Sequence, residues 1–103
     1  MVMENEEIRI VYEEERNRSA AYDGNKNVGY CEYTISSSTW TITHTVVVPS
    51  YNGRGIAKAL VLAIIEEARK RNIKIVPLCS YALKMMTKTD EYQDVLAKWK
   101  NWN

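Results

Sequence analysis

The sequence has few of the residues from which metal sites and disulfides are built. Among 103 residues there are two cysteines, Cys31 and Cys79, and a single histidine, His44. The cysteines are far apart and form no CxxC pair, so we expect no zinc or other metal site. No export signal is visible, which predicts reduced thiols and a cytoplasmic protein.

Long apolar runs and a strong net charge are also missing. The apolar stretch around residues 60–65 is far shorter than the about 20 residues that a membrane span needs, so we expect no membrane partner. The formal net charge of +1 gives no attraction to nucleic acid. Residues 1–34 carry four basic and eight acidic side chains, whereas residues 35–103 carry ten and five. This basic second part favours either an anionic ligand or only a solvated charged face.

The apolar pattern changes its period in the middle of the chain. Four segments rich in β-branched and aromatic residues predict an antiparallel meander, at residues 8–12, 19–22, 28–35 and 39–48. Helical spacing then begins at Gly55 and ends at Asn72, a plausible cap. A strand at 73–76 and two helices at 81–88 and 91–99 are expected next, the last with Trp99 as its packing anchor. The order β-β-β-β-α-β-α-α predicts one α+β (mixed α/β) domain over residues 1–103. We expect a monomer or weak dimer.

A glycine-containing turn joins the fourth strand to the first helix, with the sequence Gly53-Arg54-Gly55-Ile56-Ala57. The first amides of a helix have no intrahelical partners, and glycines let a backbone approach an anion closely. The turn is therefore a candidate phosphate site. Alternatively, the glycines only shape a tight loop.

Three side chains are candidates for chemistry, and each has a structural alternative. His44 alternates with Trp40, Ile42 and Val46, so it is either a core residue on an apolar face or a general base. Cys79 lies between a strand and a helix, where a thiol is either a nucleophile or a small buried hydrophobe. Tyr81 either donates a proton or packs in the core.

These segments resemble the GNAT superfamily of acetyl-CoA-dependent N-acetyltransferases, and most of all its small stand-alone members of about a hundred residues. The segments that carry the resemblance occur in the family's order: His44-Thr45, Gly53-Arg54-Gly55-Ile56-Ala57, and Pro77-Leu78-Cys79-Ser80-Tyr81 with Glu91-Tyr92 and Asp94 downstream. The Pro-x-Cys-Ser-Tyr segment is specific to the small subgroup. The match is close from residue 44 to residue 96.

The resemblance implies a fold in which the long strand and the later short strand splay apart around acetyl-CoA. It assigns catalysis to Cys79 and Tyr81, to which we add His44. It assigns coenzyme binding to backbone groups at nine positions: Val46, Val47, Val48, Asn52, Gly53, Arg54, Gly55, Ile56 and Ala57. The implied reaction is acetyl transfer to a small-molecule or peptide amine.

The sequence departs from the family pattern in three places. Asn52 stands where Arg or Gln is usual, Thr89-Asp90 stands where the subgroup often has His-Pro, and the helices that normally follow the first strand are missing. Those helices build much of the acceptor site. A non-catalytic module that binds coenzyme A or acyl-CoA is therefore the alternative function. An interaction domain without coenzyme, or a nucleic-acid binder, is a weaker one.

Overall fold

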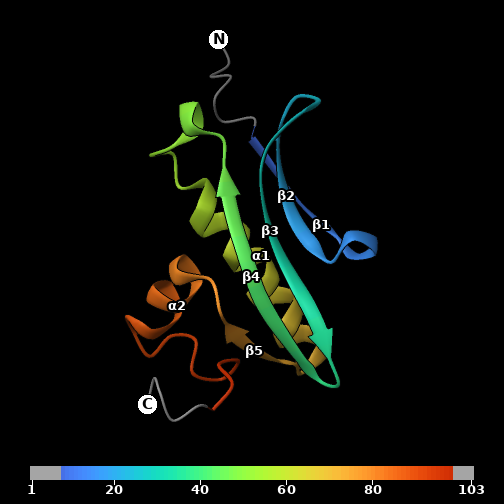
Figure 1. Cartoon of the computed structure of the whole chain (residues 1–103), viewed down its shortest axis with the longest axis vertical. Helices are drawn as coiled ribbons and strands as arrows, with labels where there is room; N and C mark the ends of the chain where they lie inside the picture. Colours follow the sequence, from blue (N-terminus) through green and yellow to red (C-terminus); the bar gives the residue numbers. More distant parts are fainter. Residues whose placement is uncertain (1–7, 99–103) are drawn as a thin grey trace.

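The computed structural model describes residues 8–98, which form one five-stranded sheet and two α-helices (Figure 1). The strands lie in chain order across the sheet: β1 (Ile8–Glu13), β2 (Arg18–Asp23), β3 (Lys26–Ser36), β4 (Thr39–Val47) and β5 (Lys74–Pro77). The first four are antiparallel, and β5 is parallel to β4. Short 3-10 turns, η2 (Glu14–Arg16) and η3 (Pro49–Tyr51), follow β1 and β4. The predicted meander and α+β fold are confirmed.

Helix α1 (Ile56–Arg71) crosses behind the sheet in Figure 1 and connects β4 to β5. Gly55 is its N-cap residue, and Asn72, with a left-handed backbone, is its C-cap residue as expected. Its apolar stripe is buried against the strands: Ile56, Leu60, Val61, Ile64, Ile65 and Ala68. Within residues 8–98, no helix is long and apolar enough to span a membrane.

Small residues of the sheet let α1 approach closely. An added Cβ on Gly29 would lie 2.8 Å from the carbonyl oxygen of Val46 and 3.3 Å from Leu60 Cδ1. The buried hydroxyl of Ser19 donates a hydrogen bond to the carbonyl oxygen of Leu60 at 2.7 Å. This contact ties the middle of the helix to the sheet.

Helix α2 (Ser80–Thr87) packs beside β4 and β5 with Ala82 and Met86 buried, close to the predicted helix at 81–88. The second expected helix, at 91–99, is wrong for residues 91–98. Turns occupy residues 91–95, and Leu96 forms a parallel bridge with Ile75. The amide of Ile75 donates to the carbonyl oxygen of Val95, and the amide of Ala97 donates to the carbonyl oxygen of Ile75. These backbone groups pair with β5 and are therefore not available for the hydrogen bonds of a helix. Trp99 lies outside the described residues.

A β-bulge in β4 divides the strand into two parts with opposite facing. Glu32 pairs with His44 and Tyr33 pairs with Ile42, which leaves Thr43 as an extra residue. The Thr43 hydroxyl donates to the carbonyl oxygen of Glu32 at 3.4 Å. Before the bulge, even-numbered residues such as Ile42 face the core, whereas after it odd-numbered residues do.

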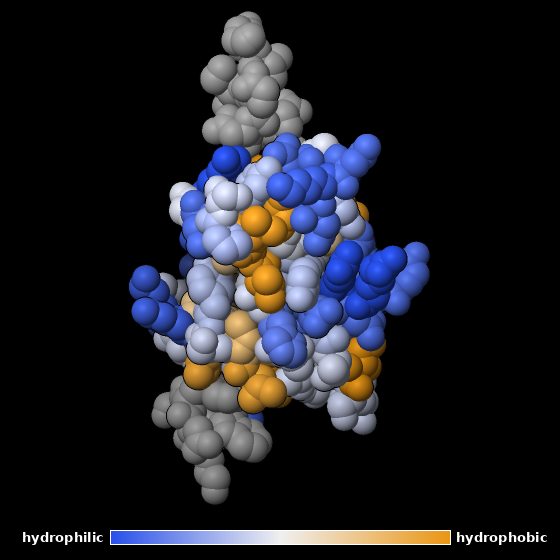
Figure 2. Space-filling view, turned by 45° about the horizontal axis from the view of Figure 1, so that its top comes forward, coloured by the Kyte–Doolittle hydropathy of each residue, from blue (hydrophilic) through white to orange (hydrophobic). Residues whose placement is uncertain are grey.

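The outer surface is mixed in character. In the view of Figure 2, apolar side chains form small separate patches between hydrophilic ones. Such a surface is ordinary for a folded domain.

Candidate functional site

Strands β4 and β5 diverge after a short paired region and leave a gap. Only Thr39–Ile42 of β4 pair with Lys74–Pro77 of β5. The amides of Leu78 and Cys79 both donate to the carbonyl oxygen of Ile42 at 3.0 Å, and the chain then turns into α2. Beyond this point β4 continues to Val47, and no strand within residues 8–98 pairs with it on this side.

The backbone groups of β4 that face the gap follow from its pairing with β3. The amide of Val48 donates to the carbonyl oxygen of Val28 at 2.8 Å, and the Val48 carbonyl accepts from Tyr51. In an antiparallel pair, alternate residues direct their backbone groups away from the partner strand. Thr45 and Val47 therefore face the gap. Val46 and Val48, which sequence reasoning placed beside Val47, bond toward β3.

The loop after β4 has free amides beside the N-terminus of α1. Gly53 and Gly55 have φ angles of 82° and 77°, a left-handed backbone that glycine adopts without strain. Within residues 8–98, the amides of residues 53–57 donate no hydrogen bond to protein, and no side chain caps α1. Unpaired amides at the positive end of a helix dipole attract phosphate oxygens.

Tyr51 holds this loop in place from the side of the β2–β3 turn. Its hydroxyl donates to Asp23 Oδ2 at 2.5 Å, and this bond is the main reason that the pKa of Tyr51 lies above its usual value. The Arg54 guanidinium lies over the same ring, 4.7 Å from its centre, and the Lys26 ammonium lies 5.5 Å away. Arg54 is therefore directed at Tyr51.

A pocket of about 210 Å³ joins the loop to the gap. Of the predicted binding residues it is lined by Val47, Asn52, Gly53, Gly55, Ile56 and Ala57, together with the predicted catalytic Tyr81. Tyr51 and Lys58 also line it, and sequence reasoning missed both. The position of Lys58 directly after the glycine turn could have identified it as a binding residue.

Cys79 is the N-cap residue of α2, at the strand-to-helix junction where the sequence placed it. Its Sγ accepts from the amide of Ala82 at 3.4 Å and lies 3.4 Å from Thr45 Oγ1. The same Thr45 hydroxyl donates to Cys31 Sγ at 3.5 Å. Burial raises the pKa of the Cys31 thiol to about 12, which keeps it protonated, whereas Cys79 is half-buried. Of the two cysteines, Cys79 is the one that a ligand in the gap can approach.

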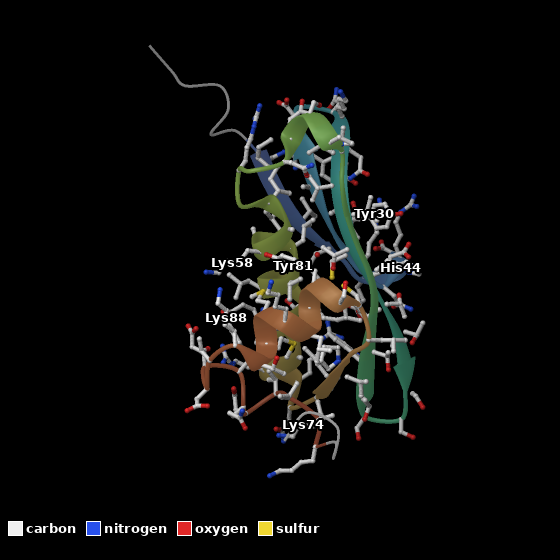
Figure 3. The ribbon with its side chains drawn as sticks, turned by 60° about the vertical axis from the view of Figure 1, so that its left-hand side comes forward. Tyr30, His44, Lys58, Lys74, Tyr81 and Lys88 are labelled. Carbon is white, nitrogen blue, oxygen red and sulfur yellow. The ribbon has the colours of Figure 1, made fainter. Side chains whose placement is uncertain are left out.

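Tyr81 projects from the first turn of α2 toward the gap and Lys58 (Figure 3). Burial, and then the nearby Cys79 and Tyr92, raise the pKa of its hydroxyl above the usual value. A tyrosine with a raised pKa stays protonated and can donate a proton to a developing anion.

His44 does not share the core face with Trp40 and Ile42, so that expectation is wrong. The bulge at Thr43 turns it to the opposite face, where its side chain is 68% exposed. Its Nδ1 lies 3.7 Å from Glu32 Oε1. Figure 3 shows His44 on the side of β4 away from Tyr81.

A second pocket, of about 430 Å³, shares Lys58 and Tyr81 with the first. Lys84 and Lys88 of the α2 region contribute further positive charge, and sequence reasoning did not single them out. Within residues 8–98, there is no group of three or more His, Cys, Asp or Glu side chains that could hold a metal ion.

Comparisons with known proteins agree with this geometry. Residues 18–95 match the family model described as GCN5-related N-acetyl-transferase. A solution structure from Staphylococcus aureus, named as that of a GCN5-like candidate N-acetyltransferase, is similar with a TM-score of 0.69 and 34% identity. The similarity covers 94% of this chain and 93% of that chain. No curated protein matches the chain.

Proposed function

The chain belongs to the GCN5-related N-acetyl-transferase family, and we propose that it transfers the acetyl group of acetyl-CoA to a primary amine. The observation that carries this proposal is the loop of unpaired amides at residues 53–57, which opens directly onto the gap beside β4. A ligand with a pyrophosphate and an extended amide-containing arm fits both parts.

In this proposal, the coenzyme lies along two sets of backbone groups. The amides of residues 53–57 and the N-terminus of α1 bind the pyrophosphate. The backbone groups of Thr45 and Val47 that face the gap bond to the amides of the pantetheine arm, as a neighbouring strand would. This arrangement directs the thioester toward Cys79 and Tyr81, which begin α2 at the far side of the gap.

The direct reaction needs an acid for the leaving thiolate. The neutral amine attacks the thioester carbonyl carbon, a C–N bond forms, and the C–S bond breaks as the coenzyme leaves as a thiolate. Tyr81 gives its proton to this thiolate, and the amine nitrogen loses a proton that restores the phenol. The raised pKa of Tyr81 keeps the proton available until the thiolate forms.

A covalent route uses Cys79 first. Its sulfur attacks the same carbonyl carbon, the C–S bond of acetyl-CoA breaks, and the thiol proton goes to the departing coenzyme. The amine then attacks the cysteine thioester, the bond from the acetyl carbon to Sγ breaks, and the proton that the amine loses restores the Cys79 thiol. The Cys79 Sγ accepts a hydrogen bond from the Ala82 amide, which holds the side chain at the start of α2. Brief incubation with acetyl-CoA should give an adduct of about 42 Da, the mass of an acetyl group, that is lost in Cys79→Ala and kept in Cys31→Ala. If no adduct forms on rapid quenching, the covalent route is excluded.

The alternative function is a module that binds the coenzyme without turnover. The face of the sheet opposite α1 favours it, because within residues 8–98 no helix covers that face. A panel of amines, polyamines and peptides with acetyl-CoA separates the two functions. Thiol release that depends on an amine and falls in Tyr81→Phe supports the transferase, whereas saturable binding with no acetylated product supports the module.

A further inference from the structure

Three lysines converge on the 430 Å³ pocket from two helical segments. Lys58 comes from the first turn of α1, and Lys84 and Lys88 come from α2 and its C-terminal cap. Figure 3 shows Lys58 and Lys88 projecting on the same side of the molecule, with Tyr81 beside them. Lys58 precedes Lys84 by 26 positions and Lys88 by 30, so only the fold brings its charge to theirs.

The charge in this pocket is not neutralised by the protein. In the part of the chain from residue 8 to residue 98, none of the three lysines forms an ion pair with a carboxylate. Lys84 and Lys88 are four residues apart, a spacing at which like charges repel on a helix. Glu91, the pocket's acidic residue, accepts a hydrogen bond from the Thr89 hydroxyl at 3.4 Å. The pocket therefore has a net positive charge that an anionic ligand would offset.

The rest of the pocket wall is apolar and aromatic. Tyr81, Tyr92 and Met85 line it, and Tyr92 is otherwise buried. Aromatic rings and a thioether are good contact surfaces for a purine. A volume of about 430 Å³ lies within the size range of small-molecule sites and suits a nucleoside with one phosphate.

We propose that this pocket binds the adenosine 3′-phosphate end of the coenzyme, and that Lys84 and Lys88 make the protein select coenzyme A over its 3′-dephosphorylated form. The proposal rests on the proposed function, because the pocket continues from the pyrophosphate loop through Lys58 and Tyr81. A phosphate monoester carries a charge of about −1.5 to −2 at pH 7, which two or three lysines match. The 3′-phosphate is the single chemical difference between coenzyme A and its dephosphorylated form.

The test is a comparison of dissociation constants for coenzyme A and dephospho-coenzyme A by calorimetry. The wild-type protein should bind coenzyme A about tenfold more tightly, as expected for exposed charge-assisted contacts. The double variant Lys84→Gln, Lys88→Gln should bind both forms with equal affinity, close to that of the wild type for the dephosphorylated form. Adenosine 3′,5′-bisphosphate should compete with coenzyme A on the wild type and lose this effect on the variant.

Lys70→Gln is the matched control, because it removes one exposed lysine of α1 that pairs with Glu67 and lines neither pocket. It should keep the wild-type preference. Circular dichroism should show the double variant folded, since both lysines are exposed.

Two results would overturn the proposal and separate it from the proposed function. Equal binding of both forms by the wild type, or an unchanged preference in the double variant, removes the role of this pocket but leaves coenzyme binding intact. Absence of binding by either form to the wild type contradicts the proposed function itself, and the pocket assignment fails with it.

Discussion

Replacing Gly55 by alanine tests whether the loop amides bind the coenzyme. Gly55 has a φ of 77° at the N-cap of α1, and an added Cβ would meet no atom within 4 Å. The cost of the substitution is therefore conformational: an alanine held in the left-handed region is destabilised by about 1–2 kcal/mol. For a domain of this size each kcal/mol lowers Tm by about 4–8 °C.

Gly24 provides a control with the same strain at a different place. It has a φ of 62°, lies in the β2–β3 turn, and also has no atom within 4 Å of an added Cβ. Gly24→Ala should lower the Tm of the free protein about as much as Gly55→Ala does. Any difference between the two variants with ligand then reports on the loop and not on stability.

The assay is thermal unfolding with and without coenzyme A. At a hundred times the dissociation constant, a ligand stabilises the folded state by about 2.7 kcal/mol, which corresponds to a Tm rise of about 10–20 °C. The wild type and Gly24→Ala should show the full rise. Gly55→Ala should lose most of it, because relief of the strain turns the amides of residues 55–57 away from a common point. A full rise in Gly55→Ala would refute the assignment of the pyrophosphate to this loop, and a loss in both variants would show that strain alone is responsible.

Other predictions follow from single contacts. Tyr81→Phe should lower kcat about a hundredfold with little change in KM for acetyl-CoA, and, because the pKa of Tyr81 lies above its ordinary value of 10.0, the alkaline loss of wild-type activity should have its midpoint above pH 10; an unchanged kcat excludes Tyr81 as the acid. His44→Ala should leave the coenzyme-induced Tm rise unchanged, since His44 lies on the exposed face; a lost rise would contradict that placement. Iodoacetamide at pH 8 should alkylate Cys79 and spare Cys31, whose thiol is buried with a pKa of about 12, as peptide mass spectrometry of the native protein would show; equal labelling would disprove this difference. Gly29→Ala should reduce the free energy of unfolding in urea by about 1–3 kcal/mol, because its Cβ would lie 2.8 Å from a β4 carbonyl oxygen; a loss below about 0.5 kcal/mol would mean that β4 shifts away from β3 at little cost.

The sequence was sufficient for the elements and their order, because each depends on local signals. β-Branched residues predict four strands, and the change to helical spacing at Gly55 predicts α1. Asn72, with a φ of 59°, ends that helix where the sequence indicates. The segment at residues 91–98 was the exception, since its backbone pairs with Ile75 of β5, a partner that local periodicity does not reveal.

The candidate site divides in the same way. The glycine turn before α1 and the position of Cys79 before α2 are local features. Both lie in the structure at the residues where the sequence predicted them. Alternation along β4 predicted the wrong face for His44, because a single extra residue, Thr43, inverts every later position. No pattern within one strand signals a bulge that is defined by pairing with its neighbour.

The sequence by itself therefore determined the fold class, the family and the position of the glycine turn before α1, all of which depend on residues close together in the chain. Tertiary structure alone decided which backbone groups of β4 face the gap, since that depends on pairing with β3. It also decided that Lys58, Lys84 and Lys88 share one pocket. The excess of positive charge after residue 34 was visible in the sequence, but only packing of α2 near the start of α1 concentrates part of it in one place.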